Sequence, residues 1–325
     1  MKILELFKIE IEYVIFNRTN FHINIHMSVH PFIDPIDSHD FNEVSSSVRS
    51  FFARKGLREV HVQHRLSILA ACEDPSTIAT YEYAGSVYPL PQTGQMWLEH
   101  ELLKNPSPPG YFCVSTSYRQ ELNPKPGRHN LIFPMIEFEI PGNMDALQAF
   151  ESDLLQHLNY PMQRCFNPDD NVLKFHYPKG DYLDVAAKYG VKELEHEHEA
   201  QLYTDFGPVF FLRHFPFDTS PFWNMKANME TKTSNKIDVI LSGFETIGSA
   251  ERSTNPDEMR NMFYNISDGM YAKTLFSRFG KDRVECELDA FLANEFVPRS
   301  GGGIGVTRLI KSLKMEALMR TPHDY

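Results

Sequence analysis

Hydrophobic and polar residues change their spacing several times along the chain. They alternate over residues 1–30, which predicts edge strands or an ordered arm. Over residues 40–56 the apolar side chains recur at helical spacing and the pattern stops at Gly56, which predicts a helix followed by a strand at residues 58–62. By the same criteria we expect strands at residues 111–118, 133–140 and 208–214, and helices at residues 145–158, 257–264 and 283–294.

The order of these elements indicates the fold class. The strands do not alternate regularly with helices as in a parallel sheet, so we expect an α+β fold in which helices flank an antiparallel sheet. No repeat or low-complexity linker interrupts the chain after residue 30. We therefore expect an N-terminal extension, residues 1–30, and a single large domain, residues 31–325.

Composition limits the classes of protein to which the chain can belong. Four cysteines lie far apart without a CxxC pair, which argues against a zinc ribbon or disulfide framework and favours a reducing cytoplasm. Charges interrupt the apolar N-terminus and no other run could span a bilayer, so we expect no membrane association. A net charge of -11 argues against a broad nucleic-acid surface, although a local basic patch stays open. The run EHEHE at residues 195–199 fits either a metal site or a solvated helix start, and we favour the helix start because His196 and His198 would not share a helix face.

The segment GGGIGVTRL at residues 301–309 is the most informative candidate for chemistry. Glycines ahead of an amphipathic segment let the backbone approach a phosphate, and Arg308 offers a planar set of donors to phosphate oxygens. A glycine run alone fits a plain turn equally well. The upstream residues Arg119 and Glu121 favour the nucleotide site, because they would supply its other half.

Four segments, in order, resemble the catalytic signatures of class II aminoacyl-tRNA synthetases. The resemblance is to the aspartyl/asparaginyl subgroup and its stand-alone, archaeal-type asparagine synthetase paralogues, and it covers residues 40–312. The first segment, residues 48–60, resembles the helix and strand of the family's dimer interface. It implies a homodimer that buries an apolar surface of Phe51, Phe52 and Val60.

The second segment, residues 118–139, implies contacts with ATP. Arg119 would reach the α-phosphate, where charge builds up during in-line attack. Glu121 would accept a hydrogen bond from the adenine amino group, and Phe133 would offer its ring to the base. The alternative is that Arg119 and Glu121 form an exposed ion pair of little energetic value.

Loop and glycine residues complete this implied ATP site. Arg128 and His129 would reach the outer phosphates from the loop of the second segment. The fourth segment is the glycine run, in which Gly303 and Gly305 would lie against the nucleotide. Arg308 would lie on the face of the adenine opposite the aromatic ring, and together with Arg119 it would be catalytic.

The third segment, residues 238–252, implies a metal and an amino acid. Two carboxylates that face one pocket repel unless a cation lies between them, so Asp238 and Glu245 would hold Mg²⁺, although both also fit solvated strand positions. Arg252 would grip a carboxylate or amide of the amino acid, with Ser249 beside it.

Residues 92–99 resemble the family's amino-acid recognition strand, with Gln95 as the contact to the substrate backbone. Aspartate-specific members have a lysine where this chain has Leu98, so the pattern is asparaginyl. Lys226 ends a stretch, residues 222–226, that resembles the pocket-wall strand. Further upstream, Glu73 matches the acid that binds the α-amino group, and it equally fits an exposed loop acid.

The resemblance implies an ATP- and Mg²⁺-dependent ligase. Only some thirty residues precede the implied catalytic domain, where synthetases of this subgroup carry an anticodon-binding barrel. We therefore expect a chain that adenylates aspartate and transfers it to ammonia, giving asparagine, and we disfavour tRNA as a partner. The alternatives are a compact asparaginyl or aspartyl-tRNA ligase, transfer of activated Asp or Asn to another acceptor, and a catalytically silent paralogue.

Overall fold

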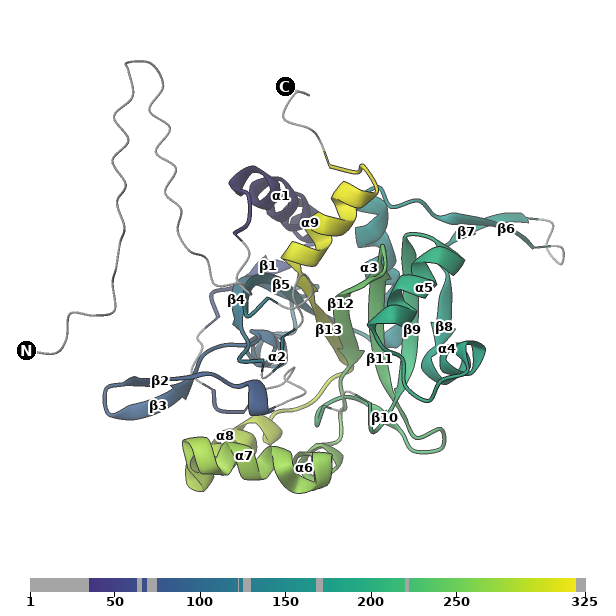
Figure 1. Ribbon diagram of the computed structural model, residues 1–325. Helices are drawn as coiled ribbons and strands as arrows, with labels where there is room; N and C mark the ends of the chain where they lie inside the picture. Colours follow the sequence, from purple (N-terminus) through teal and green to yellow (C-terminus); the bar gives the residue numbers. More distant parts are fainter. Residues whose placement is uncertain are drawn as a thin grey trace, which may run out of the picture.

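The computed structural model describes residues 35–62, 66–68, 75–121, 123–124, 130–167, 172–219 and 222–319. Its centre is a nine-stranded sheet in the order β1-β4-β5-β13-β12-β11-β9-β8, with β10 paired to β11 (Figure 1). Neighbouring strands are antiparallel except for β1 with β4 and β8 with β9 at the two edges. The α+β fold with a largely antiparallel sheet is confirmed.

The strands of this sheet are β1 (Arg58–Glu59), β4 (Tyr111–Tyr118), β5 (Ile132–Pro141), β8 (Lys179–Asp181), β9 (Val209–Pro216), β10 (Ala227–Asn228), β11 (Thr233–Leu241), β12 (Phe244–Glu251) and β13 (Arg299–Gly305). Two hairpins lie outside it, formed by β2 (Thr80–Tyr83) with β3 (Ser86–Pro89) and by β6 (Gln163–Asn167) with β7 (Val172–His176). The helices are α1 (Ser38–Arg54), α2 (Gln95–Lys104), α3 (Met144–His157), α4 (Tyr182–Tyr189), α5 (His196–Phe206), α6 (Pro256–Asn265), α7 (Met270–Phe279), α8 (Lys281–Leu292) and α9 (Val306–Met315), with short 3-10 turns at Pro75–Thr77 and Ile266–Gly269.

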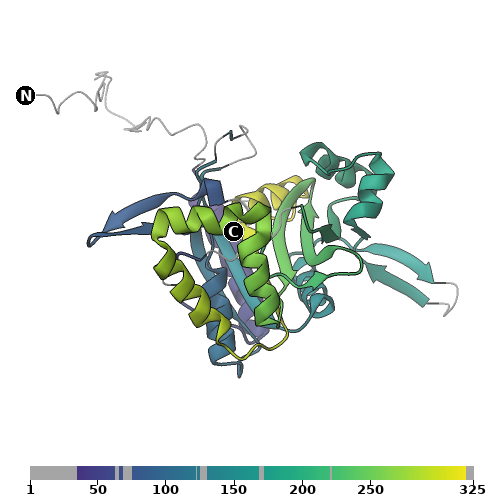
Figure 2. The ribbon, with the colours of Figure 1, turned by 90° about the horizontal axis from the view of Figure 1, so that it is seen from below.

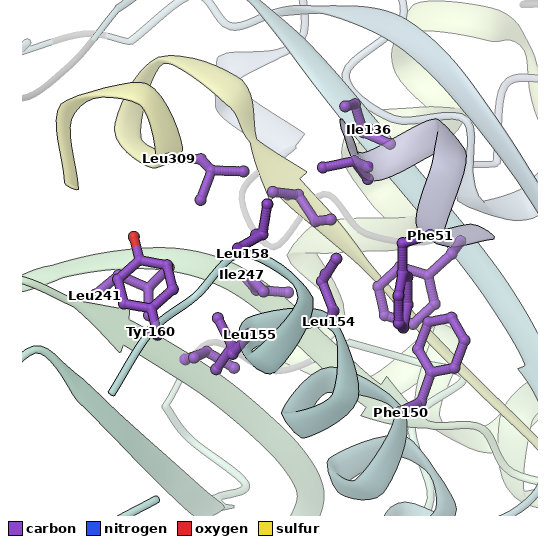
Figure 3. Close-up of a cluster of buried hydrophobic side chains, with 14 of the residues drawn as sticks. Phe51, Ile136, Phe150, Leu154, Leu155, Leu158, Tyr160, Leu241, Ile247 and Leu309 are labelled. Carbon is purple, nitrogen blue, oxygen red and sulfur yellow. The ribbon is translucent and has the colours of Figure 1, made fainter. Parts of the chain in front are cut away.

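Helices α1, α3 and α9 cover one face of the sheet and enclose the main core. Figure 3 shows Phe51 of α1, Phe150 and Leu154 of α3, Ile247 of β12 and Leu309 of α9 converging there. The apolar face of each helix follows the 3.6-residue period, and its burial is the main source of helix stability. This core packs against one face of the central strands, so a functional site can form only on the other face of the sheet.

Several helices surround the opposite face. Helices α6, α7 and α8 pack around the fully buried Trp223 and are grouped together in both views (Figures 1 and 2). Helix α2 contacts β4, β5 and β13, while α4 and α5 pack against β9. No helix among the described residues is long and apolar enough to cross a membrane.

The periodic elements were predicted well. The strands at 111–118, 133–140 and 208–214 and the helices at 40–56, 145–158, 257–264 and 283–294 are confirmed within a few residues. The strand at 58–62 is real but only two residues long. Residues 195–199 begin α5 as expected, with His198 Nδ1 accepting a hydrogen bond from the backbone N–H of Glu195. The predicted strands in residues 1–30 lie outside the described residues.

Two predicted strands are wrong. Residues 92–99 lead into helix α2 instead, because Met96, Glu99 and Leu102 recur at three-residue spacing and are all buried on one helical face. Residues 222–226 form a turn with one isolated bridge from Met225 to Arg252, and their aromatic side chains pack against α6–α8.

The expected dimer surface is also wrong in part. Phe51 and Phe52 are 4% and 0% exposed and pack against Phe150 inside the main core, so a partner subunit cannot bury them. Residue Val60 keeps partial exposure next to the edge strand β1. The homodimer itself stays a prediction.

Candidate active site

A cavity of about 400 Å³ lies on the sheet face opposite α1, α3 and α9. It brings together ten of the predicted site residues, which are Gln95, Arg119, Glu121, Phe133, Glu245, Ser249, Arg252, Gly303, Gly305 and Arg308. Asp238 and Lys226 do not line it. Glu73, Arg128 and His129 lie outside the described residues.

The floor of the cavity is built from the glycine run, which forms strand β13 in the middle of the sheet. The structure shows why these positions lack side chains. A Cβ at Gly301 would lie on Glu139, one at Gly302 would lie 2.4 Å from the Cβ of Ser249, and one at Gly303 would lie 2.5 Å from Met135 Cε. At Gly301 and Gly302 the Cβ would also lie 2.3 Å and 2.6 Å from backbone oxygens of the neighbouring strands, whereas the Met135 side chain could move away from Gly303. Glycine at 301 and 302 therefore lets the strands pack closely in the middle of the sheet.

Arg119 follows β4 at one end of the cavity. Its backbone N–H donates to the carbonyl of Leu131, which fixes the base of the side chain between the two strands. The guanidinium lies 5.7 Å from the centroid of the Phe133 ring. Its Nε is buried and has no hydrogen-bond partner among the described residues. A buried donor of this kind is costly without an acceptor, so the position suits an anionic ligand.

Arg308 and Glu245 meet at the same end. Arg308 lies in the first turn of α9 and donates to the backbone carbonyl of Glu245 at 2.6 Å. Its guanidinium is also 3.7 Å from the Glu245 carboxylate. Arg119 is the cation next to the Phe133 ring, while Arg308 contacts the start of β12. The expected position of Arg308 against the adenine stays a prediction.

The carboxylates of the two predicted metal ligands, Asp238 and Glu245, both lie near Gly248 of strand β12. A Cβ at Gly248 would lie 3.2 Å from Glu245 Oε1 and 3.7 Å from Asp238 Oδ1. Asp238 is almost buried and lies 3.4 Å from the ammonium of Lys236. Glu245 remains 40% exposed at the cavity and is the more accessible of the two ligands.

Helix α2 is held against the cavity by Glu137, a residue that sequence reasoning missed. Its carboxylate accepts hydrogen bonds from the Gly94 backbone, the Thr93 hydroxyl and, at 2.6 Å, the Ser115 hydroxyl. A carboxylate at a helix N-terminus is favoured by the helix dipole. Gln95, in the first turn, donates to the carbonyl of Phe138 at 3.0 Å.

A buried ionic network lies behind the far end of the cavity. Arg252 contacts Glu139 at 3.3 Å and Glu99 at 3.6 Å, and Glu99 binds the fully buried Arg299 through two donors at 2.8 and 3.1 Å. Asn224 also donates to Glu99 at 2.8 Å. Burial and the neighbouring Glu99 raise the pKa of Glu139, which Arg252 opposes only in part.

The sequence contained a weak signal for these missed residues. Glu99 is four residues after Gln95 on one helix, and Glu139 is two residues after Glu137 on one strand, so each shares a face with a cavity residue. Arg299 had no such signal, because only the fold brings it to α2.

Two predicted amino-acid contacts are placed differently. The hydroxyl of Ser249 donates to the carbonyl of Ile237 at 3.2 Å, so only the backbone of this residue is available to the cavity. Lys226 is 52% exposed and pairs with Glu251 at 2.8 Å. The lysine that does line the cavity is Lys236.

Comparison with known proteins gives consistent results. Residues 39–320 match the family of tRNA synthetases class II (D, K and N). In sequence, the cytoplasmic aspartate–tRNA ligase of Rattus norvegicus is 21% identical over 290 residues, covering 80% of this chain and 54% of that protein. The chain thus spans about half the length of this relative.

Solved structures show the same fold. Asparaginyl-tRNA synthetase from Pyrococcus horikoshii, complexed with asparaginyl-adenylate, superimposes with a TM-score of 0.66 at 19% identity, over 85% of this chain and 64% of that chain. A putative aspartyl-tRNA synthetase from Leishmania major gives 0.63 at 15% identity, over 84% and 61%. With the family match extending over most of its length, the chain belongs to the class II tRNA synthetases of the D, K and N type.

Proposed function

We propose that the protein is an ATP-dependent ligase that activates aspartate or asparagine as an aminoacyl adenylate. The observation that carries the proposal is Arg119, whose buried Nε lacks a partner beside an aromatic ring in a cavity with a glycine floor. A carboxylate of the amino acid would attack the α-phosphorus of ATP in line, forming the acyl–phosphate bond and releasing pyrophosphate. This would be the side-chain carboxylate of aspartate where asparagine is formed, and the α-carboxylate where tRNA is charged. Arg119 would stabilise the charge that develops on the α-phosphate oxygens.

The remaining residues at this end fit a nucleotide. Phe133 offers a ring to the adenine, Glu121 lines the same wall, and the backbone of Gly303 leaves room for the phosphates. Arg308 adds a second guanidinium. Arg128 and His129 lie outside the described residues, and their contacts with the outer phosphates stay a prediction.

Asp238 and Glu245 would hold Mg²⁺, since oxygen ligands from carboxylates suit this ion and both approach Gly248. When bound, the ion would neutralise charge on the phosphates. The chain's own contribution is to fix the two acids on neighbouring antiparallel strands, with Arg308 hydrogen-bonded to the backbone of Glu245.

For the second step we propose ammonia as the acceptor. With aspartate adenylated on its side-chain carboxylate, ammonia would attack that side-chain carbonyl, form the amide bond and release AMP, which gives asparagine. The net charge of -11 supports this choice, because it opposes binding of a phosphate backbone. The second candidate is tRNA, favoured by the names of the relatives, which are tRNA ligases and synthetases.

The test is pyrophosphate exchange with aspartate and with asparagine, followed by a reaction with ATP, aspartate and ammonium in which AMP and asparagine are measured. Exchange with either amino acid supports adenylation, and no exchange with both would refute it. Asparagine formation supports ammonia as the acceptor. Charging of purified tRNA without asparagine formation would make tRNA, and not ammonia, the better-supported acceptor.

A further inference from the structure

Glu199 contacts the candidate active site from outside the cavity. It is the last residue of the EHEHE run and lies in the first turn of α5. Its Oε2 accepts a hydrogen bond from the backbone N–H of Glu245 at 2.8 Å. Glu245 lines the cavity, whereas Glu199 does not. The run that fits a solvated helix start therefore ends in a carboxylate that binds the backbone of a site residue.

Helix α5 packs closely against the turn that joins β11 to β12. Gly243 in this turn has a φ of +84°, and a Cβ there would lie 3.2 Å from the Cα of Ala200 and 3.6 Å from the carbonyl oxygen of Glu199. Glycine permits both the left-handed conformation and the close approach of the turn to the helix backbone. The contact therefore places the Glu199 side chain next to the first residues of β12.

The backbone of Glu245 is held from two helices at a bulge in β12. The register of β11 and β12 shifts between Val239 and Ile240, which gives β12 one extra residue beside Glu245. Such a bulge disrupts the hydrogen bonds of the strand pair locally and re-aims a side chain. Here helix side chains bind both polar backbone groups of Glu245, the N–H through Glu199 and the carbonyl through Arg308 at 2.6 Å.

These contacts connect Glu199 to two charged groups inside the cavity. The carboxylate of Glu245 is 40% exposed there and lies 3.7 Å from the guanidinium of Arg308. A hydrogen bond from a backbone N–H to a carboxylate is stronger than one between neutral groups, and its loss leaves a donor without this acceptor. A shift of the bulge would move both the Glu245 carboxylate and the carbonyl that Arg308 binds. The position of both groups therefore depends on a side chain outside the cavity.

We propose that Glu199 is a positioning residue for the part of the cavity that binds the phosphates and Mg²⁺. By accepting the hydrogen bond of the Glu245 N–H it fixes the bulge, and with it the Glu245 carboxylate and the Arg308 guanidinium. The inference rests on the proposed function and adds to it a residue that acts on ATP and Mg²⁺ only through Glu245. The amino-acid part of the cavity, around Arg252, does not depend on this contact.

The experiment compares Glu199→Ala and Glu199→Gln with the parent in two measurements. Calorimetry gives the Kd of α,β-methylene-ATP with and without Mg²⁺, and pyrophosphate exchange gives the KM for ATP and for the amino acid that the parent activates. We expect Glu199→Ala to weaken binding of the analogue in the presence of Mg²⁺ on the order of 10-fold and to raise the KM for ATP, with the KM for the amino acid unchanged. Glu199→Gln should keep most of the affinity, because its amide oxygen can still accept the hydrogen bond.

Glu197→Ala is the matched control. Glu197 is also an acidic residue in the first turn of α5, so its removal has the same effect on the charge at this helix end. Its side chain is 65% exposed and lies 2.9 Å from His196. We expect this variant to match the parent in both measurements, since residues two apart on a helix do not share a face.

Three results would overturn the inference while leaving adenylation intact. These are parent-like affinity of Glu199→Ala for the analogue with Mg²⁺, equal losses in Glu199→Ala and Glu199→Gln, and an equal rise in both KM values. A parent that binds the analogue but exchanges no pyrophosphate would overturn adenylation alone, and the binding comparison then decides on Glu199. A parent that does neither would overturn the proposed function and this inference with it.

Thermal unfolding of each variant identifies a folding defect. If Glu199→Ala does not fold, Glu199→Met takes its place, because methionine has a similar length but no acceptor oxygen. Equal affinities of Glu199→Met and Glu199→Gln for the analogue with Mg²⁺ would then contradict the proposal.

Discussion

At the scale of single residues, Arg119 lines the cavity with a buried Nε that has no hydrogen-bond partner among the described residues. We expect Arg119→Ala to lower the rate of adenylation on the order of 100-fold or more, because it removes a charge-stabilising donor from the cavity. Pyrophosphate exchange measures the effect. Arg260→Ala is the control, since this arginine pairs with Asp289 at the surface and is 43% exposed. Similar rates in both variants would contradict the assignment of Arg119.

The buried ion pairs support a second prediction at this scale. Glu99→Gln removes the carboxylate that Arg299 and Arg252 share, and we expect it to lower the free energy of unfolding by about 3–5 kcal/mol. Urea unfolding is the measurement. The control is Asp289→Asn, which breaks a pair whose partners are 43% and 60% exposed and should cost less than about 1 kcal/mol. Equal effects would mean that the network is hydrated in solution.

At the scale of elements, strand β13 lies in the middle of the sheet and also lines the cavity. Gly302→Ala should destabilise the protein by about 1–3 kcal/mol, because its Cβ would lie 2.4 Å from the Cβ of Ser249 and 2.6 Å from the carbonyl oxygen of Gly248. Gly305→Ala, in the same strand, is the matched control, since its nearest neighbour would be 3.7 Å away. The midpoints of thermal unfolding compare the two. A variant Gly302→Ala as stable as Gly305→Ala would show that β12 and β13 can separate.

At the scale of the whole molecule, Glu151 links stability to pH. Burial between α3 and the sheet raises the pKa of Glu151 from its ordinary 4.5 to about 8, and the nearby Ser249 offsets this only in part. The unfolded chain loses this proton above about pH 4.5, whereas the folded chain keeps it up to about pH 8. The stability that neutral Glu151 contributes is therefore fully present below pH 4.5 and is lost as the pH rises toward 8.

Glu151→Gln cannot ionise, so its free energy of unfolding should rise relative to the parent as the pH increases through this window. Urea unfolding at both ends of the window tests this. Asp153→Asn on the same helix is the control, because Asp153 is 48% exposed and should show no such trend. Parallel pH profiles for parent and Glu151→Gln would mean that Glu151 is hydrated.

Much of this protein is determined by its sequence alone. Long periodic segments such as 111–118 and 145–158 form the predicted elements, because period and end signals are local properties. The same holds for the segments around Arg119, Glu245 and Arg308, whose family resemblance led to residues that do line one cavity.

Only the tertiary structure decided how distant segments meet. Phe51 and Phe52 are apolar in any fold, yet packing against α3 turned them inward, away from a dimer surface. Glu99 and Arg299 are separated by 200 residues, so no local pattern could pair them. The choice of Lys236 over Lys226 as the cavity lysine depends on strand register, which fixes the face of each side chain through contacts with neighbouring strands. Register is a long-range property, and it is the physical reason that the lysine lining this cavity could not be identified from the sequence.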